Sequence, residues 1–126
     1  MNKNLMYALV SILFISCEQI LEEDIQKKEV ELIIPANGIR LSMQNVGFLW
    51  EGIDGAESYR LQIVNPDFTV PQTLVLDTLI HKKSFRQYLD LGKYEWRVRA
   101  ENSAYQSDFT TYVFWVDTLN SSRISK

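Results

Sequence analysis

The stretch from Gly92 to Ala100 alternates strictly between apolar and polar side chains. Tyr94, Trp96 and Val98 fall on one face together with Ala100, and charged side chains fall on the other. A period of two with aromatic and β-branched residues predicts a strand with one face in a core and one in water. Two large aromatic side chains on the buried face need partners on both sides, so this strand is expected at the centre of a sheet.

Shorter stretches with the same alternation flank this strand, and turn residues separate them. Turn chemistry occurs at 35–38 and at Asp54-Gly55, and two prolines bound the loop 65–71. Seven short strands in about a hundred residues predict an antiparallel two-sheet sandwich. The expected strands are 30–34, 46–51, 58–63, 74–76, 82–88, 92–100 and 110–116, with 39–41 as a short edge continuation of the first.

The N-terminal residues predict a cleaved export signal rather than part of the fold. Lys3 precedes an apolar run from Leu5 to Ile15 that only Ser11 interrupts. Such a run is too short for a permanent membrane-spanning helix. Residues 1–16 are therefore interpreted as a signal peptide.

Cys17 is the only cysteine in the chain, and it lies where cleavage is expected. The sequence from Leu13 to Cys17, with small Ser16 before the cysteine, resembles a bacterial lipobox. The resemblance implies that Cys17 becomes the lipidated first residue of the mature chain, anchored at about 0.8 kcal/mol per buried CH2. The alternative is an ordinary signal peptide with a stray thiol, although an unpaired cysteine in an exported chain otherwise has no partner.

Residues 17–28 are charged and lack a clear period, and they predict a lipidated tether. Glu22, Glu23 and Asp24 loosely resemble the acidic export signal of Bacteroidetes-type surface lipoproteins, and a solvated linker is the equal alternative. The folded domain is expected over 29–117, followed by a polar tail over 118–126 that frays.

Three blocks of sequence resemble a fibronectin type III domain of the kind common in bacterial extracellular proteins. They are 48–51, 55–63 and 92–100, and the resemblance extends from about Val30 to Val116. It implies a seven-stranded antiparallel immunoglobulin-like β-sandwich, but no particular ligand, because such domains serve as spacers, docking modules and ligand binders. The side chains expected between the sheets are Trp50, Tyr59, Leu61, Tyr94, Trp96, Val98, Phe114 and Val116.

Composition argues against several kinds of chemistry. A net charge of −3 argues against a nucleic-acid partner. His81 is the only histidine, and no G-x-S-x-G motif accompanies it, so neither a catalytic triad nor a typical zinc site is expected. We expect no enzyme, no metal and no cofactor.

The outer face of the central strand offers candidate binding residues. If Phe114 points inward, Trp115 points outward beside the polar side chains of neighbouring strands. A tryptophan beside arginines and an acid can stack a sugar ring or seat a protein partner. The alternative is that the stems of Arg97 and Arg99 cover Trp115. The candidate residues are Trp115, Arg97, Arg99, Arg60 and Glu95, on a face that also includes Gln62, Thr111 and Val113.

A second candidate surface consists of Phe68, Tyr105 and Phe109, which lie in or beside loops and are expected at one end of the sandwich. The alternative is packing under those loops.

These features lead to three functional hypotheses. The first is a cell-envelope lipoprotein, lipid-anchored in the outer membrane and facing the periplasm or the surface, whose domain is a non-catalytic module for an envelope or extracellular protein. The second is a glycan-binding accessory lipoprotein of an outer-membrane sugar-uptake system. The third, an enzyme, is disfavoured.

The lipobox generates a direct test of the membrane address. Cells that express the full chain should incorporate labelled palmitate into it, and Cys17→Ser should abolish the label because no other thiol can be acylated. Autoradiography of the purified chain measures this. Label that persists in Cys17→Ser would contradict the anchor.

Overall fold

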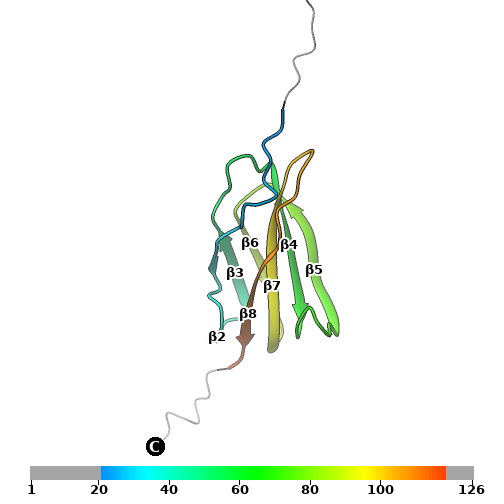
Figure 1. Cartoon of the computed structure of the whole chain (residues 1–126). Coiled ribbons are helices and arrows are strands. Elements are labelled where there is room, and N and C mark those ends of the chain that lie inside the picture. Colours follow the sequence, from blue (N-terminus) through cyan, green and yellow to red (C-terminus); the bar gives the residue numbers. More distant parts are fainter. Residues whose placement is uncertain (1–20, 119–126) are drawn as a thin grey trace, which may run out of the picture.

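The computed structural model describes residues 21–118, which fold as strands joined by turns and loops (Figure 1). The proposed signal peptide, Cys17 and most of the expected tail lie outside the described residues. Within residues 21–118, no helix is long and apolar enough to cross a membrane. The strands are β1 (Leu32–Ile34), β2 (Ile39–Leu41), β3 (Asn45–Trp50), β4 (Ser58–Asn65), β5 (Thr73–Ile80), β6 (Ser84–Tyr88), β7 (Gly92–Glu101) and β8 (Thr110–Val116).

The strands form two sheets that pack as a sandwich (Figure 1). One sheet has the order β1-β3-β6, and the other has the order β2-β8-β7-β4-β5. β7 lies between β4 and β8 and is antiparallel to both, which confirms the expected central strand. The all-β sandwich predicted from alternation is therefore the observed fold.

Aromatic side chains from both sheets fill the space between them. The Trp96 ring of β7 lies 5.1 Å from the Phe48 ring of β3, and Phe48 in turn lies 5.8 Å from Phe114 of β8, both in edge-to-face geometry. Tyr94 stacks on Phe114 at 5.6 Å within the larger sheet. All eight residues predicted to lie between the sheets are buried. Edge-to-face and offset contacts of this kind add stability beyond the area they bury.

Tyr94 also anchors the turn into β7 through its hydroxyl group. This hydroxyl donates a hydrogen bond to the backbone oxygen of Asp90 at 2.7 Å, and Leu89 beside it is buried. A tyrosine near the start of this strand that bonds a few residues upstream is a hallmark of immunoglobulin-like sandwiches. Burial raises the pKa of this hydroxyl, with a smaller effect from Asp90.

β2 departs from the expected seven-stranded antiparallel arrangement. Residues 39–41 do not continue the first strand but cross to the other sheet, where they pair with β8 in parallel. The turn at 35–38 causes the switch: Gly38, at φ 83°, donates to Val113 O, and Asn37 Oδ1 accepts from Val113 N–H. Positive φ is readily available to glycine, so this short turn can redirect the chain.

β5 is longer than the expected strand at 74–76. It pairs with β4 from Tyr59↔Ile80 to Asn65↔Thr73, with a register shift between Ile63 and Val64. The shift places an unpaired residue in β5, so apolar and polar positions do not alternate cleanly along its sequence.

The segment expected as a tether is packed against the domain from Glu22 onward. Ile25 is fully buried in the core, and Lys28 bonds both Glu23 Oε1 at 2.7 Å and Asp54 O at 2.8 Å. Asn102 Nδ2 donates to Glu23 O at 2.8 Å. Residues 22–28 therefore belong to the folded unit, because one apolar side chain among charged ones is enough to fix a short segment on an open core edge.

Trp96→Ala tests the aromatic layer. Trp96 is fully buried, so the truncation should cost about 3–5 kcal/mol of unfolding free energy, measured by urea denaturation. Trp96→Phe is the matched control: it keeps an aromatic ring and removes an indole N–H that has no hydrogen-bond partner within the described residues. Equal losses in the two variants would contradict the layer's role.

Ile25→Ala tests whether residues 22–28 are structural. The loss of a fully buried isoleucine should cost about 2–5 kcal/mol in the same measurement. Leu21→Ala is the control, because Leu21 is 86% exposed and should cost little. A free tether would make the two variants indistinguishable.

Candidate binding surface

The outer face of the five-stranded sheet brings together most of the residues singled out in the sequence. The strand register places Arg97 opposite Gln62 and Arg60 opposite Arg99, while Asp77 of β5 lies opposite Gln62. Side chains directly opposite on one face lie about 4.5–5.5 Å apart at Cβ. Thr111 of β8 lies opposite Arg97, so four strands present one continuous polar row across the sheet.

Two of its arginines already have carboxylate partners. Arg60 binds Asp77 through two hydrogen bonds, at 2.7 and 3.2 Å, and Arg99 Nε bonds Glu101 at 2.8 Å. These carboxylates offset the repulsion expected between Arg60 and Arg99, which lie directly opposite each other. The hydrogen bond from Arg60 is the main reason that the pKa of Asp77 is lowered.

Arg97 lies between two phenyl rings. Its guanidinium carbon is 3.9 Å from the ring centre of Phe68 and 4.2 Å from that of Phe109. Its Nε donates to Gln62 Oε1 at 2.7 Å, and the nearby Glu95 accepts the Phe68 backbone N–H at 2.8 Å. Burial lowers the pKa of Arg97, and the charge of Arg99 adds to that effect. We call Arg97, Phe68, Phe109, Gln62 and Glu95 the arginine–aromatic cluster.

Trp115 lies apart from this cluster. It lies opposite Lys93, at the start of β7. The guanidinium carbon of Arg40, in β2, is 4.8 Å from the centre of the Trp115 ring, and the same guanidinium forms an ion pair with Asp117 at 2.8 Å. The prediction that Arg97 and Arg99 cover Trp115 was therefore wrong: an arginine does cover the ring, but it is Arg40. The parallel pairing of β2 with β8 brings Arg40 to this ring instead, and β2 was not expected in this sheet.

The three loop aromatics do not share one end of the sandwich. Phe68 belongs to the β4–β5 loop and Phe109 is the last residue of the β7–β8 loop, and Figure 1 shows these loops at opposite ends. Phe68 and Phe109 instead meet over Arg97, while Tyr105 packs against the core. The alternation of Trp115, Val113 and Thr111, extended back two residues, would have placed Phe109 on this face. No periodic signal marks Phe68.

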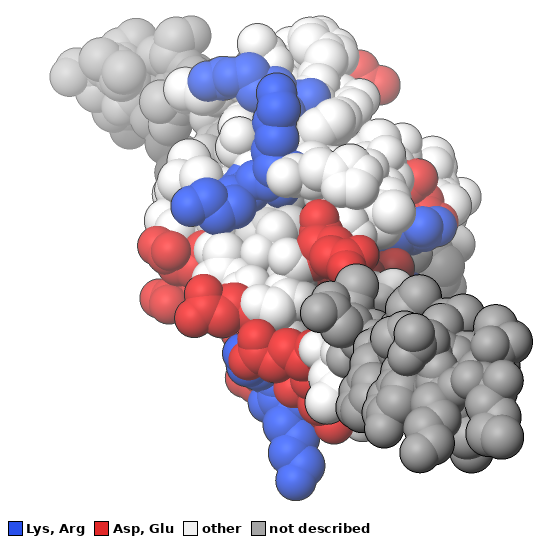
Figure 2. Space-filling model, turned by 90° about the horizontal axis from the view of Figure 1, so that it is seen from above, with Lys and Arg blue, Asp and Glu red and all other residues white. Residues whose placement is uncertain are grey.

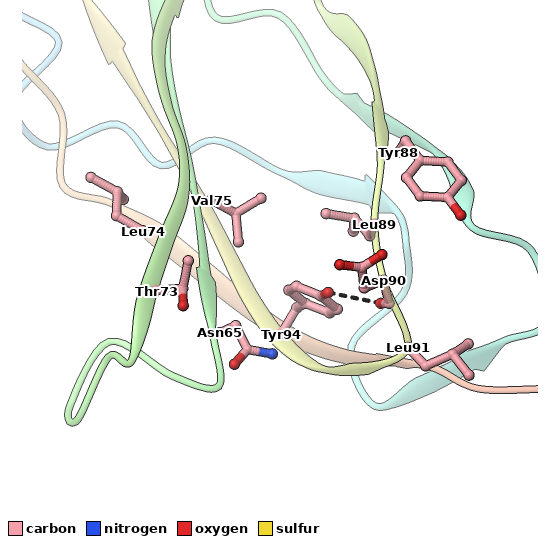
Figure 3. A pocket seen from close by; sticks show the side chains of 9 residues that line it. All are labelled: Asn65, Thr73, Leu74, Val75, Tyr88, Leu89, Asp90, Leu91 and Tyr94. Atoms are coloured by element: carbon pink, nitrogen blue, oxygen red, sulfur yellow. Dashed lines mark hydrogen bonds between the residues drawn. The ribbon is translucent and has the colours of Figure 1, made fainter.

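A hollow of about 520 Å³ opens between the start of β5 and the β6–β7 connection (Figure 3). Figure 3 shows Val75, Leu89 and Tyr94 turned toward it. Leu74, Tyr88 and Leu91 on its rim are each at least half exposed. The sequence does not predict this hollow, because its walls come from edges of the two different sheets. It is lined by Asn65, Thr73, Leu74, Val75, Tyr88, Leu89, Asp90, Leu91 and Tyr94.

The end that carries the N-terminal segment is rich in acids, as the view onto it in Figure 2 shows. A hydrogen bond between the carboxyl groups of Glu22 and Glu57 raises the pKa of Glu57, and a hydrogen bond from Ser103 lowers the pKa of Glu22. His81 is exposed, with Nδ1 3.3 Å from Glu57 O. Across residues 21–118, no group of three His, Cys, Asp or Glu side chains is arranged to hold a metal ion.

Asp77→Asn tests the Arg60–Asp77 pair through its pH dependence. A lowered pKa in the folded state adds stability that is complete above the ordinary aspartate pKa and is lost as pH falls through the folded value. The stability difference between the parent chain and Asp77→Asn should therefore shrink below a pH of about 4. Urea unfolding over a pH series measures it. With Arg60→Gln in the background, the difference should be small at every pH, whereas a pH-independent difference would contradict the pairing.

Comparisons with known proteins bear on the fold alone. No family model matches the chain, and no curated protein matches its sequence. One similar solved structure is titled FN3tt mut, at 19% identity and TM-score 0.45, covering 71% of this chain and 86% of that one. Another is the fibronectin type-III domain of human fibronectin type III domain containing protein 3, at 17% identity and TM-score 0.44, covering 77% and 94%. Likenesses this loose indicate no ligand, and the sandwich is assigned from its own strand order and register.

Proposed function

We propose that this chain is a lipid-anchored envelope protein whose sandwich domain is a non-catalytic module that binds another protein. The observation that carries the proposal is the arginine–aromatic cluster on the outer sheet face. Arginine and aromatic residues are enriched where proteins bind one another, and they dominate the binding energy there. A sheet face without a deep cavity suits a broad protein contact better than a small ligand, which needs enclosure.

The exposed apolar side chains on the rim of the hollow support the same function. Leu74 belongs to β5, which is an edge of the larger sheet, and the exposed Tyr88 and Leu91 lie across the hollow from it. Exposed apolar side chains grouped around a concavity are typical of interaction surfaces. The rim of the hollow thus adds a second contact surface at the end of the sandwich opposite the N-terminal segment.

The anchor limits how the domain is presented. Four residues separate Cys17 from Glu22, where packing against the domain begins, and a fully extended chain spans about 17 Å over that distance. A lipidated Cys17 would therefore keep the acidic end of the sandwich close to the membrane. The outer sheet face and the hollow, away from that end, would remain accessible to a partner.

Site-specific crosslinking in living cells tests the binding role. A photoreactive residue at Thr111, exposed beside Arg97, should crosslink the full chain to a protein. The same probe at Ser84, exposed in the three-stranded sheet, is the matched control and should give at least about fivefold less product, because hot spots cluster within one patch. Gel analysis of the captured species measures this, and equal capture at both positions would contradict the assignment.

The glycan-binding alternative makes a different prediction in the same cells. Capture at Thr111 that free sugars abolish, together with glycan-array binding that Trp115→Ala removes, would favour it over a protein partner. The position of Arg40 over the Trp115 ring argues against sugar stacking on that face of the ring.

A further inference from the structure

Arg97 is the one arginine of the five-stranded sheet without a carboxylate partner among residues 21–118. Arg40 pairs with Asp117, Arg60 with Asp77 and Arg99 with Glu101, whereas no carboxylate oxygen lies within 4.0 Å of an Arg97 nitrogen. The nearest acid on its own strand, Glu95, is engaged by the Phe68 backbone N–H. Asp77, Glu95 and Glu101 on this face thus each have a partner, whereas Arg97 has no carboxylate partner among the described residues.

The surroundings of Arg97 raise the free-energy cost of leaving its guanidinium without a carboxylate, and they fix its orientation. Two phenyl rings remove water from the guanidinium and return only part of the lost solvation through cation–π attraction. Arg97 Nε donates a hydrogen bond to Gln62 Oε1, which fixes the guanidinium in place. The two terminal nitrogens donate to no group within the described residues, so they remain available as a pair of donors.

We infer that Arg97 is the receptor for a carboxylate carried by the protein partner, held as a two-pronged ion pair between Phe68 and Phe109. This step rests on the proposed function for the class of partner. A planar guanidinium matches a carboxylate bidentately, and desolvation by aromatic neighbours strengthens such a pair. An Asp or Glu of the partner would supply the negative charge that Arg97 does not find among the described residues.

A purely structural role makes a separate prediction. If Arg97 only ties the Phe68 and Phe109 segments to the sheet, its substitution should change stability and leave no specific response to carboxylates. A readout at the guanidinium itself distinguishes the two roles, because it reports binding while the domain stays folded.

The test is an NMR titration of the full chain in detergent micelles, following the arginine Nε–H signals. The probe is N-acetyl-hexaglutamate, with N-acetyl-hexaglutamine and inorganic phosphate at matched ionic strength as the other arms. The Arg97 signal should shift and saturate with hexaglutamate alone. The variants lack the Arg97 signal, so their binding is read from the backbone amide of Thr111, which lies opposite position 97. Arg97→Lys keeps the charge but loses the planar pair of donors, so it should bind hexaglutamate about tenfold more weakly, and in Arg97→Met the Thr111 amide should not shift.

Arg40→Met is the matched control, because Arg40 also lies over an aromatic ring but already has Asp117. It should bind hexaglutamate as the parent chain does. Equal shifts of the Arg40 and Arg97 signals, no shift at Arg97, or a response to phosphate as strong as that to hexaglutamate would each overturn the inference. Crosslinking at Thr111 that survives in Arg97→Met would overturn it too while leaving the proposed function intact.

Discussion

The contact between Trp96 of β7 and Phe48 of β3 holds the two sheets together. The sequence contains a single cysteine, so no disulfide within the chain can join the sheets. Attachment depends on packing, and the largest fully buried side chains, Trp50, Trp96 and Phe48, come from both sheets. In a domain of this size, a layer of interlocked aromatic rings is a large share of a stability of only about 5–15 kcal/mol.

Two short segments, β2 and residues 22–28, cover edges of the sandwich that the longer strands leave exposed. β2 crosses from one sheet to the other and protects the β8 edge, while residues 22–28 place Ile25 against the core. Each segment contributes little regular structure, yet each covers apolar surface or backbone that would otherwise meet water.

The outer sheet face can be polar and charged because the side chains of the inner face supply the packing that stabilises the domain. β7 alternates between Tyr94, Trp96 and Val98 inward and Glu95, Arg97 and Arg99 outward, so the same strand builds the core and presents the cluster. Ion pairs on such an exposed face contribute little to folding. The cluster combines a rigid strand position for Arg97 with loop residues that fold over it.

Alternation along the chain was enough to predict the sandwich, the central strand and the eight core positions, because a strand's two faces are written into its sequence at a period of two. It also placed Arg60, Glu95, Arg97 and Arg99 on one face. Tertiary structure alone decided which side chains meet: Phe68 with Arg97, Arg40 with Trp115, and Ile25 with the core. These contacts join residues from loops, a strand that changes sheets and a charged segment, none of which carries a period, so their partners depend on where the packed sheets bring them.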